Sequence, residues 1–171
     1  VKLERKGETR LMDEVAQGIV ADASPIGSPI KDSSIERGLM LLNDLPGVEV
    51  KSTLVPGASV GTSDLVVETT QGPLVNGAVD ADNFGNKFTG ATRVGGTVNI
   101  NDPSGRGDQV ILRGMASGLG GSNGDGGMRY FRGAYSMPVG TAGTKLGVAY
   151  TGMNYTLGQD FAALNANGTS S

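Results

Sequence analysis

The first seventy residues carry two stretches of helical periodicity. Between residues 11 and 21 the apolar side chains recur at helical spacing, and Asp13 and Glu14 open the stretch, where the helix dipole favours acidic side chains. A second helix is predicted to begin at Ser33, which stands three residues before Glu36 as in a capping box. It is predicted to end at the Leu45–Pro46–Gly47 break.

Short alternating stretches flank these two helices. "VKLERKG" (1–7) predicts a first strand, and "GVEVKSTLVPG" (47–57) and "TSDLVVETT" (62–70) predict two more. Leu65 and Val67 are expected to point inward, and the alternation of the middle strand is expected to slip near Ser52. The resulting order, β-α-α-β-β, predicts a compact α+β domain with two helices on one face of a three-stranded sheet.

Such a sheet has edges, and an edge presents N–H and C=O groups that can pair with an extended peptide. The alternative is that the three strands only close a small core. The alternation does not say which strand lies at an edge, so the sequence leaves both readings open at this point.

The remaining hundred residues alternate with a period of two. Stretches of eight to twelve residues, separated by loops rich in Gly, Asn, Asp and Pro, predict strands at 74–81, 91–100, 108–117, 128–137 and 144–155, and 160–168 as a possible sixth. In "ATRVGGTVNI" (91–100) the apolar side chains fall on one face, while Arg93, Thr97 and Asn99 fall on the other.

Strands of this length with one apolar and one polar face fit an outer-membrane β-barrel, in which every backbone group must pair. A soluble β-sandwich or solenoid has the same alternation, so the pattern leaves both open. The loops at 101–107 and 138–143 are shorter or tighter than the one at 118–127. Short turns at one end and long loops at the other favour the barrel.

Composition distinguishes the two halves of the chain and limits the functions that its side chains can support. Of 29 glycines, 7 fall in residues 1–71 and 22 in residues 72–171, so a domain boundary is predicted at Gln71–Gly72–Pro73. The 14 basic and 17 acidic side chains are scattered, whereas a nucleic-acid surface needs a clustered basic stripe. The chain has no Cys and no His, which removes thiolate ligands and the commonest general base. We therefore predict no enzyme activity, catalytic residue, metal site or cofactor.

Three motifs invite functional readings that we set aside. "RGD" (106–108) is predicted to be a turn before a strand, and "GLGGSNGDGG" (118–127) a flexible surface loop. Asp80, Asp82 and Asn83 lie at a predicted hairpin, where such residues serve the turn or hydrogen bonds beside it. Arg129 and Arg132 have opposite parity, so a regular strand cannot place both on one face unless a bulge or a strand end intervenes.

Five segments, in order, resemble one known family. "IERGLMLLNDLPGVEVKSTLVPGASVGTSDLVVE" (35–68) is similar to the end of its second periplasmic POTRA domain, and "VDADNFGNKFTG" (79–90) to the hairpin that opens its barrel. "GDQVILRG" (107–114), "YSMPVGTAGTKLGVAY" (135–150) and "YTLGQDFAALNANG" (155–168) resemble later barrel strands. The family is that of the TpsB transporters of two-partner secretion, the haemolysin activation/secretion (ShlB/FhaC/HecB) proteins of the Omp85 superfamily. The chain looks like a fragment of one.

The resemblance implies a fold and a role. Residues 1–71 would be an α+β POTRA domain (β-α-α-β-β), truncated at its start, and residues 72–171 the first five or six strands of an antiparallel transmembrane β-barrel. The protein would lie in the outer membrane with the POTRA domain in the periplasm. The POTRA domain would recognise an unfolded, large secreted exoprotein of the TpsA type, an adhesin or haemolysin, and the barrel would pass it outward. Lipid would be the other partner, with no nucleic acid and no cofactor.

The role that the resemblance implies leads us to a hypothesis about the binding residues. We expect the strand at residues 48–55 to be the edge that pairs with the exoprotein, because Glu49 and Lys51 are its polar outward residues. This set comprises Val48, Glu49, Val50, Lys51, Ser52, Thr53, Leu54 and Val55. The expected pore-lining residues are Arg93, Thr97, Asn99 and Arg113.

The family barrel has about sixteen strands and a loop inserted into its lumen, so residues 72–171 cannot close a pore alone. Two other functions remain open: an Omp85-type barrel-assembly factor and a soluble, glycine-rich secreted β adhesin. An enzyme is the least supported class.

Overall fold

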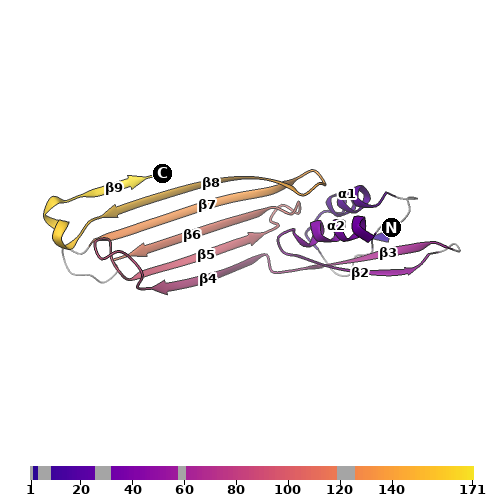
Figure 1. Ribbon diagram of the computed structural model, residues 1–171, viewed down its shortest axis with the longest axis horizontal. Coiled ribbons are helices and arrows are strands. Elements are labelled where there is room, and N and C mark those ends of the chain that lie inside the picture. Colours follow the sequence, from indigo (N-terminus) through magenta and orange to yellow (C-terminus); the bar gives the residue numbers. More distant parts are fainter. Residues whose placement is uncertain (1, 4–8, 26–31, 58–60, 119–125) are drawn as a thin grey trace. The chain divides into compact units, whose positions relative to one another are not determined.

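A computed structural model describes residues 2–3, 9–25, 32–57, 61–118 and 126–171 (Figure 1). Two compact units make up the chain: unit 1 takes in residues 1–74, 101–109 and 136–146, and unit 2 takes in residues 75–100, 110–135 and 147–171. The elements are β1 (Lys2–Leu3), α1 (Asp13–Ala23), α2 (Asp32–Asn43), β2 (Val48–Pro56), β3 (Ser63–Gln71), β4 (Val75–Asp82), β5 (Arg93–Asn101), β6 (Gln109–Ser117), β7 (Gly127–Val139), β8 (Thr144–Thr156), the 3₁₀ helix η1 (Gln159–Leu164) and β9 (Asn167–Ser170).

The first part of unit 1 has the predicted order β-α-α-β-β. Its three strands form one sheet in the order β1-β3-β2, with β1 parallel and β2 antiparallel to β3. Because β3 lies in the middle, its side chains of one parity meet the core. Leu65 and Val67 are 3% and 0% exposed, which confirms their predicted inward direction.

One hydrophobic core joins the two helices to this sheet. Two causes produce it: the helical spacing of apolar residues places them on one face of α1 and of α2, and the period of two places Leu65 and Val67 on one face of β3. Burying one valine, leucine or isoleucine side chain stabilises the fold by roughly 1.5–3 kcal/mol. The core residues are Leu11, Ala16, Ile19, Val20, Ile35, Leu42, Leu45, Val48, Leu65 and Val67.

Two details predicted for this part are wrong. The β2–β3 ladder runs through nine consecutive residue pairs, from Val48 with Gln71 to Pro56 with Ser63, so no slip occurs near Ser52. The middle of β2 lacks apolar side chains because that part of the strand is exposed. Helix α2 includes Asp32, so Ser33 lies inside its first turn and is not the residue that precedes the helix. The first strand was predicted over 1–7, of which only Lys2–Leu3 falls among the described residues.

The second sheet has six strands in sequence order, β4-β5-β6-β7-β8-β9. Strands β4 to β8 lie where the alternation predicts them, within two residues at every end. The possible sixth strand at 160–168 is wrong in place. Residues 159–164 form η1, and the sixth strand is the short β9, which pairs with residues 153–156 of β8.

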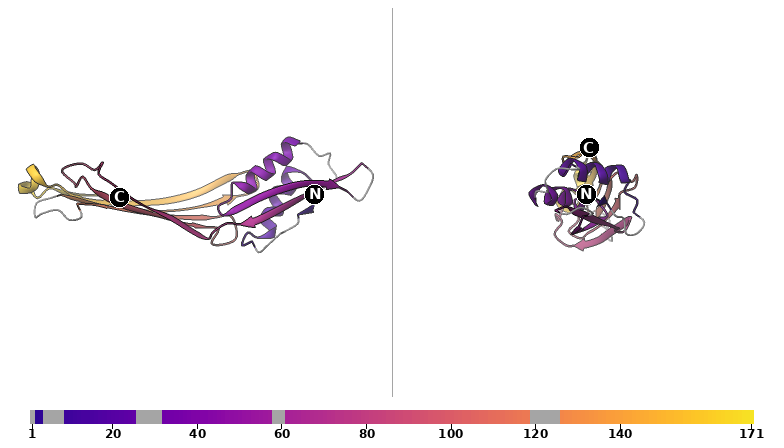
Figure 2. Two further views of the ribbon diagram at one scale, coloured as in Figure 1. Left: turned by 90° about the horizontal axis from the view of Figure 1, so that it is seen from below. Right: turned by 90° about the vertical axis from the view of Figure 1, so that its right-hand side faces the viewer.

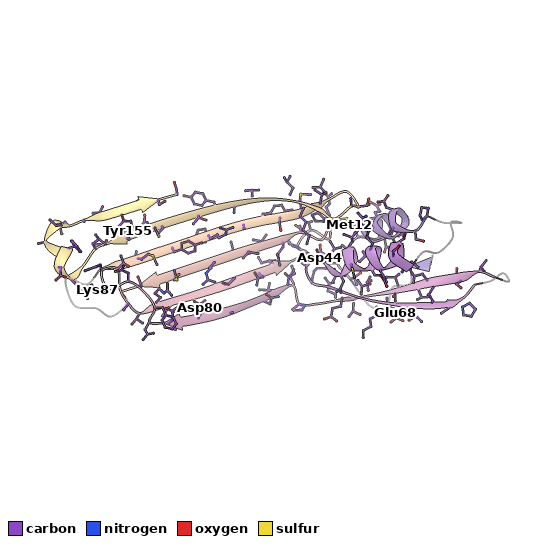
Figure 3. The ribbon with its side chains drawn as sticks, in the orientation of Figure 1. Met12, Asp44, Glu68, Asp80, Lys87 and Tyr155 are labelled. Carbon is purple, nitrogen blue, oxygen red and sulfur yellow. The ribbon has the colours of Figure 1, made fainter. Side chains whose placement is uncertain are left out.

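This six-stranded sheet has no dry core among the described residues. Every buried hydrophobic side chain of the described residues lies between Leu11 and Val67, whereas large apolar side chains of β4 to β8 are exposed. Seen edge-on, the strands form a single layer (Figure 2, left), and their side chains are distributed along the whole length of the sheet (Figure 3). No helix in the described parts of the chain is long and apolar enough to cross a membrane.

The connections of the sheet differ in length and in the unit to which they belong. The short turns at 102–108 and 140–143 belong to unit 1, whereas the longer connections at 83–92 and 157–166 belong to unit 2. Most of the predicted loop at 118–127 lies outside the described residues. Gly107 and Gly143, with φ of +77° and +90°, let each short turn lie close to a leucine of the first domain. A Cβ atom on them would meet Leu45 at 2.8 Å and Leu41 at 2.5 Å respectively.

Candidate functional site

Strand β2 lies at the edge of the three-stranded sheet, as predicted for residues 48–55. In an antiparallel pair, alternate residues direct both backbone groups to the partner strand and the others direct them away. The N–H of Gly57 donates to the carbonyl of Thr62, which continues the β2–β3 register and places the odd-numbered residues on the partner side. The even-numbered residues of β2 therefore direct their N–H and C=O groups outward.

The outward groups at the start of β2 already have partners. The N–H of Val48 donates to the carbonyl of Leu45 at 3.3 Å, and the N–H of Val50 donates to the side-chain oxygen of Asn43 at 3.4 Å. No contact of this kind is seen at Ser52 or Leu54 within the described residues. Among the eight predicted residues, the outward N–H groups at the start of the strand are thus hydrogen-bonded, and those of Ser52 and Leu54 are available at its end.

Side chains at the open end are also accessible. Leu54 is 57% exposed, although it stands opposite the buried Leu65 and therefore shares the helix-facing side of the sheet. Glu49, Lys51 and Thr53 are exposed on the opposite side. An extended segment beside Ser52 and Leu54 would meet an apolar side chain on one side and polar side chains on the other.

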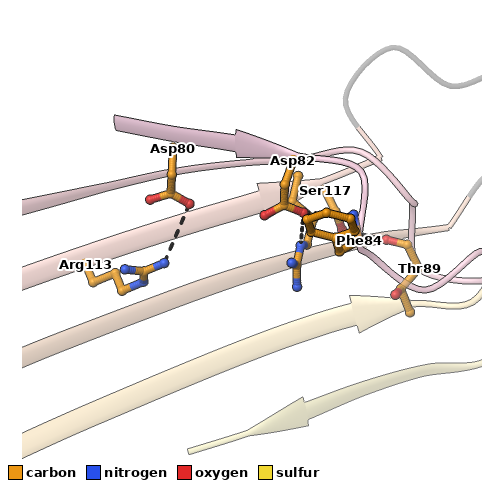
Figure 4. A network of polar contacts seen from close by, with 7 residues as sticks. Asp80, Asp82, Phe84, Thr89, Arg113 and Ser117 are labelled. Carbon is orange, nitrogen blue, oxygen red and sulfur yellow. Dashed lines mark hydrogen bonds and ion pairs between the residues drawn. The ribbon is translucent and has the colours of Figure 1, made fainter. Parts of the chain in front are cut away.

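The second candidate site is a polar network on one face of the six-stranded sheet (Figure 4). Arg93 pairs with Asp82 at 2.8 Å, and Arg113 lies 3.6 Å from Asp80 and donates to the Thr97 hydroxyl at 3.3 Å. The amide of Asn99 donates to that of Asn76 at 2.8 Å in the same face of the β4–β5 pair. The structure therefore brings Arg93, Thr97, Asn99 and Arg113 together on one face, although the expectation that this face lines a pore stays a prediction.

The acidic residues of this network, Asp80 and Asp82, take part in hydrogen bonds and ion pairs, as predicted from their place at a hairpin. Asp82 accepts the backbone N–H of Phe84 at 2.9 Å in addition to the guanidinium of Arg93. Nearby, the hydroxyl of Ser117, the last residue of β6, donates to the carbonyl of Thr89 in the connection at 83–92 (Figure 4). Arg129 is the third residue of β7, so it lies at a strand end.

The opposite face of the sheet is apolar and exposed. In β4 and β5 the residues between the polar ones are valine, isoleucine, alanine or glycine, and Leu112 has the parity opposite to Arg113. In β7 and β8, Phe131 and Tyr150 line one shallow groove. The large exposed side chains assigned to this face are Val75, Val79, Val94, Val98, Leu112, Phe131, Tyr135, Leu146, Val148 and Tyr150.

The turn at 102–108 is a third polar cluster, which the periodic patterns did not predict. Asp108 is 2% exposed and accepts the N–H and hydroxyl of Ser104 at 3.1 and 2.8 Å. Asp102 is fully buried and accepts the N–H of Gly107 at 2.6 Å. The Arg-Gly-Asp sequence lies in this turn, as predicted, closed by the N–H of Asp102, which donates to the carbonyl of Asp108. Because Asp108 is buried, its carboxylate is not presented to a receptor.

This turn is tied to residues far away in the sequence. The N–H of Arg10 donates to the side chain of Gln71 at 2.6 Å, and its guanidinium lies 3.5 Å from the carbonyls of Gly72 and Asn101. The Asn101 side chain donates to the carbonyl of Pro73 and accepts from Gln109. Four buried polar atoms here have no hydrogen-bond partner among the described residues: Thr9 Oγ1, Arg10 Nε, Gln71 Nε2 and Asp102 Oδ2.

Burial raises the pKa of Asp102, although the N–H of Gly107 opposes that shift. The folded carboxyl therefore keeps its proton to a higher pH than the unfolded one, whose ordinary value is 3.8. As pH rises from that value through the raised folded pKa, the folded state loses stability relative to the unfolded state. We expect Asp102→Asn, which keeps the acceptor for Gly107, to remove this loss. Urea unfolding of both proteins across this pH range checks the prediction, and parallel pH curves would contradict it.

The described residues contain no group of three or more His, Cys, Asp or Glu side chains that could hold a metal ion. Sequence reasoning missed Arg10, Asn43 and Asn101. A lone polar residue outside a periodic pattern carries no signal of the partner it will meet, so no feature of the sequence identified them.

The sequence comparisons match this chain to secretion and transporter proteins. The family model of the haemolysin secretion/activation proteins ShlB/FhaC/HecB matches residues 61–171. The heme/hemopexin transporter protein HuxB of Haemophilus influenzae (strain 86-028NP) is 29% identical over 141 residues, which cover 82% of this chain and 24% of that protein. The chain therefore spans about a quarter of the length of the curated relatives that it matches.

Two solved structures share the fold. CdiB from Escherichia coli matches with a TM-score of 0.68 and 26% identity, over 91% of this chain and 28% of that one. CdiB from Acinetobacter baumannii matches with a TM-score of 0.62 and 17% identity, over 98% of this chain and 31% of that one, and at this identity the likeness concerns the fold alone.

Proposed function

Because the chain belongs to the haemolysin secretion/activation (ShlB/FhaC/HecB) family, we propose that it is part of an outer-membrane transporter for a secreted protein partner. Residues 1–71 act as a POTRA-type periplasmic domain that binds the unfolded partner, and residues 72–171 supply the first strands of the barrel through which it passes. The curated relative HuxB is a heme/hemopexin transporter protein by name, which supports a role in transport.

The observation that carries this proposal is the difference between the two faces of the six-stranded sheet. One face holds the Arg93 and Arg113 network, and the other exposes large apolar side chains such as Val148, which is 68% exposed. A soluble sandwich would bury its apolar face against a second layer, whereas a barrel strand turns that face to lipid and the polar one to a lumen. Further strands from the rest of the transporter would complete the cylinder.

The position of β2 supports the role of the first domain. An unfolded protein in transit has no tertiary structure to recognise, but its backbone can add a strand to an open sheet edge. The outward groups of Ser52 and Leu54 offer such an edge. This recognition depends mainly on the backbone, which suits a partner that is long and extended.

A proline at Ser52 tests this role. The N–H of Ser52 points outward, so Ser52→Pro removes one donor from the open edge without removing a bond to β3. We expect binding of the partner's extended targeting segment to the complete transporter to weaken about tenfold, as when one hydrogen bond and the fit around it are lost. The dissociation constant in detergent is the measurement.

The control distinguishes the edge from the fold. Thr53 directs its N–H to β3, so Thr53→Pro breaks the ladder and should lower stability as well as binding. Glu49 and Lys51 have the same parity as Thr53, so prolines there also test folding. Unchanged binding by a stably folded Ser52→Pro protein would reject β2 as the binding edge.

Nothing seen in the described residues favours barrel assembly over secretion, and the family takes its name from secretion. A soluble adhesin would need a dry core in residues 72–171, where every buried side chain of the described residues is small or polar.

A further inference from the structure

The edge of β2 is closed at both ends by different means. At its start, Asn43, the last residue of α2, accepts the outward N–H of Val50, and the carbonyl of Leu45 accepts that of Val48. At its end stands Pro56, which has an outward position but no N–H to donate. The outward donors between these limits are those of Ser52 and Leu54.

The contact of Asn43 differs from an ordinary ladder bond. Its length of 3.4 Å is near the upper limit for a hydrogen bond, and the atoms are exposed. Such a bond contributes little to folding, so the fold does not depend on it. It nevertheless occupies the one donor that would extend the open edge by a further residue pair.

We propose that Asn43 sets the register of strand addition to β2, by confining the incoming segment to the outward groups of Ser52 and Leu54. This inference rests on the proposed peptide-binding role of β2 and adds the residue that positions the peptide. An incoming strand that is shifted by two residues toward Val50 would have to displace Asn43. Because side chains alternate with a period of two, such a shift would leave the same side chains of the segment facing the helices, so Asn43 sets the position of the segment along β2.

The chemistry of the edge defines the segment that it fits. The partner residue beside Leu54 shares the helix-facing side of the sheet and meets an apolar side chain that is 57% exposed. The residues before and after it lie on the side of Lys51 and Thr53, which are exposed and polar. The edge therefore suits an extended segment in which apolar and polar residues alternate, with few contacts that depend on one exact sequence.

The experiment uses hydrogen exchange at single amides in the full chain, with a synthetic eight-residue peptide of alternating Thr and Val as the probe. In the original sequence we expect the peptide to protect the amides of Ser52 and Leu54 and to leave that of Val50 unchanged. In Asn43→Ala we expect the Val50 amide to exchange faster without the peptide and to become protected with it. The peptide should bind Asn43→Ala about two- to tenfold more tightly.

Asn43→Asp is the matched control, because its side chain keeps an oxygen acceptor for Val50 and should reproduce the original protection pattern. Two failures are distinguishable. Protection of Ser52 and Leu54 in every protein, without protection of Val50 in Asn43→Ala, would overturn the role of Asn43 alone. Absence of protection at Ser52 and Leu54 in all three proteins would overturn the proposed peptide-binding edge itself.

Discussion

An arginine in place of Val148 is expected to prevent stable insertion of the complete transporter into a lipid bilayer. Val148 lies near the middle of β8, on the apolar face, and is 68% exposed. If that face contacts hydrocarbon, a charge there costs about 2–4 kcal/mol near the bilayer midplane. This is a large fraction of the free energy that separates folded from unfolded protein.

The neighbouring residue supplies the control. Ala149 has the opposite parity, shared with Lys145, so Ala149→Arg places the same charge on the polar side of the same strand. The measurement is the urea-dependent folded fraction of each protein in phospholipid vesicles. Equal folding of the two arginine proteins would contradict a lipid-facing side, and full solubility of both without detergent would favour a water-exposed sheet.

Leu42→Ala is expected to have the other large effect, this time on the core of the first domain. Leu42 is 0% exposed and lies among the residues of α1, α2 and β3 that form the core. Removing a buried side chain of this kind costs about 2–5 kcal/mol, because burial is lost and the cavity refills only in part. For a domain of this size, such a loss approaches the whole free energy of unfolding.

Far-ultraviolet circular dichroism during urea unfolding measures this effect, because both α-helices among the described residues lie in unit 1. Met40 lies on the same helix and is 69% exposed, so Met40→Ala is the matched control and should change stability by less than about 0.5 kcal/mol. A similar effect of the two substitutions would mean that α2 packs through a different face.

Local periodicity accounts for what the sequence could predict. Helical spacing placed α1 and α2, and the period of two placed β4 to β8 and the inward direction of Leu65 and Val67. These features arise from the repeat of the backbone itself, so neighbouring residues are enough to reveal them.

The parts that were missed depend on contacts between distant residues. Arg10 meets Asn101 across 91 positions, and the burial of Asp102 follows from the packing of its turn within unit 1. The direction of each β2 amide follows from its register with β3, which residues 48–55 do not specify alone. The place of β9 was missed because its four residues are too few to show an alternating pattern.

The membership of the two short turns in unit 1 has a consequence for how such transporters can be recombined. Residues 1–74 fold together with 101–109 and 136–146, through contacts such as that of Lys145 with Asp44 at 3.2 Å. A chimaera that joins the first domain of one relative to the strands of another at Gly72 would therefore separate parts that fit each other. The unit to exchange is therefore discontinuous in sequence. A chimaera should take residues 1–74, 101–109 and 136–146 from the same relative.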